Sequence, residues 1–176
     1  MLFDNFLKTL EILASNANFV NGFYLKVFSP RVVTEIRGAQ ISRDDNVLHI
    51  GCGAVPYTPE IIARYTGAKV VAIDNDPKMV SKARSYIQKK RISNVQIRYG
   101  SGIDFPLEKF NVIYVSLGVC PLRPILKRII KEGKGKRIIF RISTRLAGIL
   151  YNKSAYFYAE GETLGGRIRK SKILFL

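Results

Sequence analysis

Strand and helix patterns alternate through the middle of the chain. Short apolar runs, typical of buried β-strands, occupy residues 46–50, 68–74, 94–100, 110–117 and 136–143. Between them, stretches with apolar residues three and four positions apart predict helices at 58–66, 76–91 and 121–133. Strands separated by helices of this length predict an α/β fold, with a parallel sheet, right-handed crossovers and helices on both faces.

The N-terminal part of the chain has a helical pattern instead. Apolar residues at helical spacing predict an amphipathic helix at 2–14. Ser29 followed by Pro30 is a helix-start signal for a second helix, which would end near Gly38. We therefore expect residues 1–40 to form an N-terminal helical extension that acts as a lid or cap.

The C-terminal part reads as a β-hairpin. Residues 154–176 hold two β-rich halves on either side of a turn-rich middle that contains Gly165 and Gly166. This pattern predicts an antiparallel hairpin added to the parallel sheet. The α/β domain would then span residues 41–176.

A glycine turn follows the first strand, in the sequence NVLHIGCGAVPYT. Gly51 and Gly53 allow a sharp turn and a close approach of a ligand to the backbone, and the next helix directs its positive N-terminus at the same space. Pro56 stands where a dinucleotide fingerprint would carry its third glycine, and it lacks an N–H donor. The turn therefore predicts a nucleotide site but disfavours NAD or FAD.

A second feature of this site is Asp74, which ends the strand at 68–74. A carboxylate at the carboxyl end of the second strand can accept two hydrogen bonds from a ribose diol. Asp76 has a competing role as the N-cap of the helix that starts at Pro77. We therefore assign the ribose to Asp74 and the helix cap to Asp76.

The segments VLHIGCGAVPYT, VVAIDNDPKMVSKAR, VQIRYGSGIDFP and FNVIYVSLGV together resemble the class I S-adenosylmethionine (SAM)-dependent methyltransferases. The resemblance runs from residue 46 to about 145, and it implies a Rossmann-like fold with SAM as the cofactor. A terminal antiparallel hairpin suits that family. The resemblance implies that Gly51 and Gly53, with Cys52 between them, line the methionine end of SAM, and that Asp74 binds the ribose hydroxyls. It also implies that Asn75, Ser101 and Gly102 lie beside the adenine. Ser116 and Leu117 would then face the sulfonium.

The chain departs from the family pattern at Ser101, where many members carry an acid that accepts from the adenine amino group. Either Ser101 makes a weaker contact or Asp104, three residues on, replaces it. Cys52 lies inside the turn and could touch a ligand, but no neighbour in sequence would activate its thiol, so we interpret it as a small space-filling residue.

The transferred group and its acceptor are less determined than the cofactor. The strand at 110–117 continues as GVCPLRP rather than the Asn/Asp-Pro-Pro-Tyr motif of amino-directed nucleic-acid methyltransferases. Cys120 lacks the preceding proline of cytosine-5 enzymes. We expect a methyltransferase that acts on a small-molecule or RNA acceptor by in-line attack, and no catalytic residue is assigned.

A fainter, local resemblance links the glycine turn and RISTRLAGILYN to nicotianamine-synthase-like enzymes, which transfer the aminocarboxypropyl arm of SAM. It would make Tyr24 and Tyr57 candidates to contact the substrate amine. This aminocarboxypropyl transfer is the alternative reaction.

The chain is strongly basic, with 29 Lys and Arg against 13 Asp and Glu, a formal net charge of +16. This balance favours a polyanionic partner such as RNA and leaves open a non-catalytic nucleic-acid-binding module on the same fold. The basic stretches at 82–91, 127–137 and 167–172 belong to elements that usually cover different sides of such a sheet, so a single RNA groove does not follow. The aromatic segment 19–28 is either core, a lid over the site or a dimer contact.

No metal site is expected, because Cys52 and Cys120 lie far apart and His49 is the only histidine. We interpret His49, inside the apolar run VLHI, as a packed strand residue. The sequence contains no apolar run long enough to span a membrane, and the charges at 4, 8 and 11 interrupt any signal-peptide core. We therefore expect a cytoplasmic protein without membrane contact.

Overall fold

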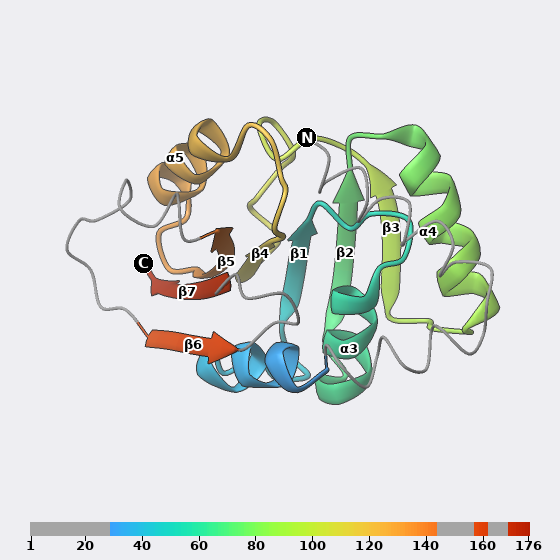
Figure 1. Cartoon of the computed structure of the whole chain (residues 1–176), viewed down its shortest axis with the longest axis horizontal. Helices are drawn as coiled ribbons and strands as arrows, with labels where there is room; N and C mark the ends of the chain where they lie inside the picture. The colour runs from blue at the N-terminus through green and yellow to red at the C-terminus, as the bar shows by residue number, and fades with distance from the viewer. Residues whose placement is uncertain (1–28, 144–156, 162–168) are drawn as a thin grey trace.

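The computed structural model describes residues 29–143, 157–161 and 169–176. Its sheet has seven strands in the order β3-β2-β1-β4-β5-β7-β6 (Figure 1). The strands are β1 (Asn46–Ile50), β2 (Lys69–Asp74), β3 (Val95–Tyr99), β4 (Val112–Val115), β5 (Arg137–Ser143), β6 (Phe157–Gly161) and β7 (Arg169–Phe175). The pairs among β1 to β5 are parallel, whereas β7 is antiparallel to both β5 and β6.

The central strands are buried on both faces, as continuous apolar runs in a parallel sheet require. All four residues of β4 are buried, as are the last four of β1. β1 lies between β2 and β4, and its His49 is in register with Ala72 on one side and Tyr114 on the other. The strand order therefore reverses direction at β1, which places the ends of β1, β2 and β4 at the usual ligand-binding edge of such a sheet.

The helices are α3 (Tyr57–Thr66), α4 (Pro77–Lys89) and α5 (Leu122–Glu132), together with a helix at 29–38. The predicted cap of α4 is present, since the Asp76 side chain accepts from the Lys78 amide at 2.8 Å and Pro77 occupies the first helical position. α3 begins at Tyr57, one residue before the predicted Thr58. The helix at 29–38 ends at Gly38, as predicted, but Gly38 is not its left-handed cap, since the residue with positive φ after this helix is Gln40, at 52°.

Two apolar clusters cover the two faces of the sheet. One cluster joins the helix at 29–38, α3 and α4 to the sheet through residues such as Val32, Ile62 and Val70. The other joins α5 to the opposite face through residues such as Leu48, Ile113 and Ile125. The predicted Rossmann-like α/β fold, with helices on both faces and a C-terminal antiparallel hairpin, is therefore confirmed.

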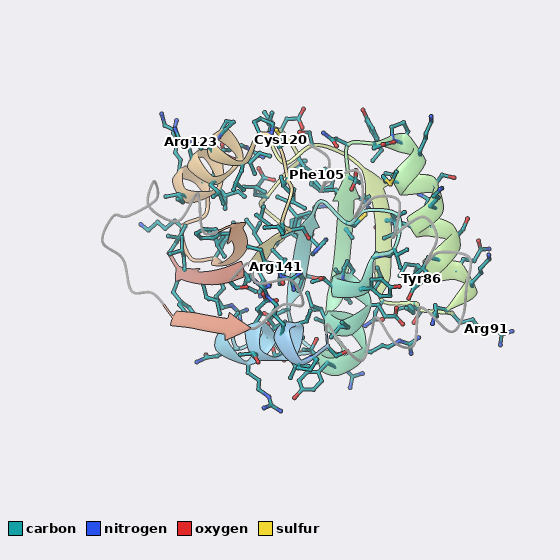
Figure 2. The ribbon with its side chains drawn as sticks, in the orientation of Figure 1. Tyr86, Arg91, Phe105, Cys120, Arg123 and Arg141 are labelled. Atoms are coloured by element: carbon teal, nitrogen blue, oxygen red, sulfur yellow. The ribbon has the colours of Figure 1, made fainter. Side chains whose placement is uncertain are left out.

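A buried carboxylate ties the helix at 29–38 to the sheet. Glu35 is fully buried and accepts from Arg141 at 2.7 and 3.0 Å, from Arg31 at 3.3 Å, and from the hydroxyls of Tyr114 and Ser171. Figure 2 shows Arg141 in the space between the sheet and this helix. Burial alone would raise the pKa of Glu35, but the charge and hydrogen bonds of Arg141 hold it below its usual value. The carboxylate therefore stays ionised and links the helix to β4, β5 and β7.

Several predictions lie wholly or mostly outside the described residues: the helix at 2–14, the aromatic segment 19–28 with Tyr24, the hairpin turn at Gly165 and Gly166, and the RISTRLAGILYN segment at 141–152, of which the structure describes only 141–143. The division into an extension at 1–40 and a domain at 41–176 stays a prediction. Within the part of the chain that the structure describes, no helix is long and apolar enough to cross a membrane.

Candidate cofactor site

The predicted site residues gather at the carboxyl edge of the sheet, where the arrowheads of β1, β2 and β3 end (Figure 1). Gly51 and Gly53 both adopt positive φ, at 80° and 66°, which a residue with a side chain rarely adopts. A Cβ added at Gly51 would lie 2.5 Å from the Val119 side chain and 3.6 Å from Cβ of Ser116. The first glycine therefore lets the turn pass directly against the chain that leaves β4.

The backbone of the glycine turn is anchored to β2. The amides of Gly51 and Cys52 both donate to the Ile73 carbonyl, at 2.9 and 3.0 Å, and the Gly53 amide donates to Asp74 Oδ2 at 2.8 Å. These three donors are thus used inside the protein, and Pro56 has none to offer. A diphosphate would need such amides, so the turn suits a ligand without one.

Asp74 is half-buried and is held by backbone on both oxygens. Oδ2 accepts from the Gly53 amide at 2.8 Å and Oδ1 from the Asp76 amide at 3.0 Å. An ionised carboxylate offers about four acceptor positions, so about two remain beyond these contacts. Two remaining positions on a fixed carboxylate match the two hydroxyls of a ribose, and the site therefore fits the nucleoside half of SAM.

The loop after β3 reaches the same edge, since the Gly100 amide donates to the Asp74 carbonyl at 3.0 Å. Gly102 is buried, and a Cβ there would lie 2.9 Å from Ile50 Cγ2 and 3.0 Å from Ile125 Cγ2. The hydroxyl of Ser101 accepts from the Ile103 amide at 3.2 Å, while Asp104 is exposed. Gly102 thus allows the loop to pack on β1 and α5, and Ser101 stabilises its turn.

The remaining predicted residues differ in exposure. Asn75 is exposed beside Asp74, Ser116 and Leu117 are half-buried at the end of β4, and Cys52 is buried. Cys120 is exposed in the loop before α5, at the upper edge of the sheet in Figure 2. Among the described residues, no three His, Cys, Asp or Glu side chains gather as a metal site would require.

One contact at this edge was missed from the sequence. Nε2 of His49 lies 3.0 Å from the Ser116 hydroxyl, and the His49 ring lies 5.2 Å from that of Tyr114. Burial, reinforced by the nearby Arg141 charge, lowers the pKa of His49 to about 3, so its ring is neutral at physiological pH. The alternation of side chains along β4 could have predicted this contact. It places residue 116 on the same face of the sheet as Tyr114, and Tyr114 pairs with His49 in the neighbouring parallel strand.

With this geometry in place, sequence comparison decides the family. The profile of a family described as a methyltransferase domain matches residues 41–164, which is more than half of the chain. The chain belongs to this methyltransferase family. The predicted membership of the class I SAM-dependent methyltransferases is therefore confirmed, and SAM is the cofactor, as predicted.

Curated relatives of this methyltransferase are the sterol 24-C-methyltransferases of Saccharomyces cerevisiae and Eremothecium gossypii. Each is 34% identical over 86 residues, which is 47% of this chain and 22% of the relative. The match thus spans about a fifth of the length of these relatives, and it shows no common acceptor.

Two solved structures extend the likeness. A variant of MtNAS, a nicotianamine synthase, in complex with SAM has a TM-score of 0.76 and 20% identity, covering 99% of this chain and 74% of that one. An RNA methyltransferase from Salinibacter ruber in complex with S-adenosylhomocysteine has a TM-score of 0.64 and 18% identity, covering 82% and 90%. At these identities the likeness shows a common fold.

Proposed function

We propose that the methyltransferase transfers the methyl group of SAM to a nucleophilic atom of a small-molecule acceptor. The observation that carries this proposal is the fixed Asp74 carboxylate beside the Gly51–Gly53 turn, with two acceptor positions left for the ribose of SAM. Asn75, Ser101 and Gly102 would then border the adenine, and Ser116 and Leu117 the sulfonium. Catalysis would rest on alignment of the acceptor with the methyl group and on exclusion of water.

The distribution of charge supports a small-molecule acceptor over RNA. α4 carries Lys and Arg without any Asp or Glu, but it packs on the face of the sheet that also holds α3. The lysines of α5 belong to the opposite face. Within the described residues, the basic side chains of α4 and α5 therefore do not form one continuous RNA-binding groove, and the net charge of +16 does not by itself define an acceptor site.

Calorimetry with S-adenosylhomocysteine tests the cofactor site. Asp74→Ala should weaken binding roughly 100-fold, because two hydrogen bonds to a charged acceptor are lost. Asp76→Ala is the matched control, since it removes the neighbouring carboxylate that caps α4: it should cost about 1 kcal/mol of stability and leave the affinity unchanged. Equal affinities for wild type and the Asp74 variant would refute the assignment.

Isotope labels test which group is transferred. SAM labelled in its methyl group and SAM labelled in its carboxyl group are incubated separately with candidate acceptors. Methyl transfer puts only the methyl label in the product. Appearance of the carboxyl label instead would replace this proposal by aminocarboxypropyl transfer at the same site, and Tyr57, buried at the start of α3, would become the side chain to test.

A further inference from the structure

The two ring nitrogens of His49 differ in their hydrogen bonding. His49 is 1% exposed, and its Nε2 is paired with the Ser116 hydroxyl at 3.0 Å. Its other nitrogen, Nδ1, is buried and has no hydrogen-bond partner. Among the described residues, it is the only buried side-chain nitrogen or oxygen atom without one. This asymmetry decides which nitrogen carries the proton.

A neutral imidazole has one N–H and one acceptor nitrogen. If Nδ1 carried the proton, a buried donor would be left without a partner, and orphaned buried N–H groups are the rarer and costlier kind. If Nε2 carries it, the proton points at the Ser116 hydroxyl, and only an acceptor is left unpaired. His49 therefore donates from Nε2, and the Ser116 oxygen accepts.

This assignment leaves the hydroxyl proton of Ser116 available to a ligand. Within the described residues, His49 is the hydrogen-bond partner of the Ser116 side chain. Ser116 is half-buried at the end of β4, and its Cβ lies 3.6 Å from the position that a Cβ on Gly51 would take. The free O–H is therefore beside the glycine turn, in the space assigned to the methionine end of SAM.

The chemistry of that space selects the group that the hydroxyl binds. The sulfonium of SAM is a cation and repels the positive end of an O–H dipole. The carboxylate of the aminocarboxypropyl arm is an acceptor, and the amides of Gly51, Cys52 and Gly53 are already used by Ile73 and Asp74. A side-chain donor beside the turn is thus valuable to that carboxylate.

We propose that Ser116 donates a hydrogen bond to the carboxylate of the SAM aminocarboxypropyl arm, and that His49 is the positioning residue that orients this hydroxyl as a donor. The inference rests on SAM occupying the glycine turn as described above. The groups that face His49 are the Tyr114 ring, Arg141 and Glu35. The guanidinium of Arg141 and the carboxylate of Glu35 stay charged from pH 5 to 8, so the orientation of the Ser116 hydroxyl persists across this range.

The single histidine makes the first half of the proposal directly measurable by nitrogen NMR of the ligand-free protein. The spectrum should show one neutral imidazole with its proton on Nε2 and no titration between pH 5 and 8. A proton on Nδ1, or a protonated ring at pH 7, would overturn the positioning role of His49.

Calorimetry with two ligands tests the second half. S-adenosylhomocysteine has the carboxylate, whereas 5′-methylthioadenosine has the same nucleoside and sulfur without the aminocarboxypropyl arm. Ser116→Ala should weaken the first about tenfold and leave the second unchanged. An equal loss for both ligands, or for neither, would overturn the proposal, whereas absence of binding of either ligand to the wild type would overturn the cofactor site itself and this inference with it.

Matched substitutions separate the donor from mere packing. His49→Gln places an amide N–H near the position of Nε2 and should keep the affinity for S-adenosylhomocysteine, whereas His49→Asn places it near Nδ1 and should lose about tenfold. His49→Phe should behave as His49→Asn, and adding Ser116→Ala to it should cost nothing further. Circular dichroism checks that each variant folds; if the Phe variant does not, the Gln and Asn pair still decides. Equal affinities in that pair would overturn the role of His49.

Discussion

The Glu35 cluster carries the sharpest stability prediction of the fold. Glu35→Gln keeps the shape of the side chain but removes its charge. Tyr114 and Ser171 donate to different oxygens of Glu35, so the hydroxyl that faces the new amide nitrogen can rotate to accept from it while the other still donates to the amide oxygen, whereas the guanidiniums of Arg31 and Arg141 cannot accept at all. The substitution therefore costs stability mainly because it removes the anion that Arg31 and Arg141 pair with, and the side chains of these two arginines are only 12% and 15% exposed.

The expected magnitude follows from this burial. Removal of one partner of a buried ion pair typically costs about 3 to 5 kcal/mol, and the small residual exposure of the arginines places the cost near the lower end, about 3 kcal/mol. For a chain of this size the melting temperature should fall by roughly 6 to 12 °C. Arg37→Gln, on the same helix but exposed and paired with exposed Tyr65, is the control and should cost about 0.5 kcal/mol or less.

The stabilisation by Glu35 depends on pH. The folded-state pKa of Glu35 lies below its usual value of 4.5, so its stabilising contribution is complete above about pH 4.5 and is lost as the pH falls through the lowered folded value. Urea unfolding of wild type and Glu35→Gln at pH 7 and pH 3 should show a gap that narrows in acid. A loss below about 1 kcal/mol at pH 7, or a gap that is the same at both pH values, would refute the reasoning.

Two further substitutions test local geometry. Gly51→Ala, with its φ of 80° and a Cβ 2.5 Å from Val119, should cost more stability than Gly135→Ala, which has a φ of 78° and open space, because only the first adds a clash; equal melting temperatures would contradict this. Tyr86→Phe removes the 2.6 Å hydrogen bond to buried Glu60, so thermal unfolding should show a loss of about 1 to 3 kcal/mol. Burial and Glu60 raise the pKa of Tyr86, so the Phe variant should leave the tyrosinate absorbance up to pH 11 unchanged, and a lowered absorbance would argue against that burial.

The layered fold and the glycine turn could be predicted because their signals are local. β4 is an unbroken apolar run, the start of α4 is marked by Asp76 and Pro77, and Asp74 ends its strand beside them. Glu35 and His49 could not be interpreted in the same way, because their partners lie far along the chain. Tyr114 and Ser171 are 79 and 136 positions from Glu35, and Ser116 is 67 positions from His49. In sequence Glu35 is one polar residue of an amphipathic helix, and only the packing of that helix on the sheet buries it.

The placement of the basic residues also predicts how the protein binds RNA, if it does so only through its charge. Paired reversals on α4 (Lys82→Glu with Lys89→Glu) and on α5 (Lys127→Glu with Lys131→Glu) change opposite faces of the sheet. With no shared groove, each pair removes contacts from one face while the other face still binds, so each should weaken the observed affinity for single-stranded RNA by a similar, small factor of about two and leave the slope of log affinity against log salt nearly unchanged. Gel shifts at several salt concentrations measure both quantities, and affinity for S-adenosylhomocysteine should stay unchanged. If one pair abolished binding while the other had no effect, the charge would define a single RNA face, and the small-molecule acceptor proposed above would give way to RNA.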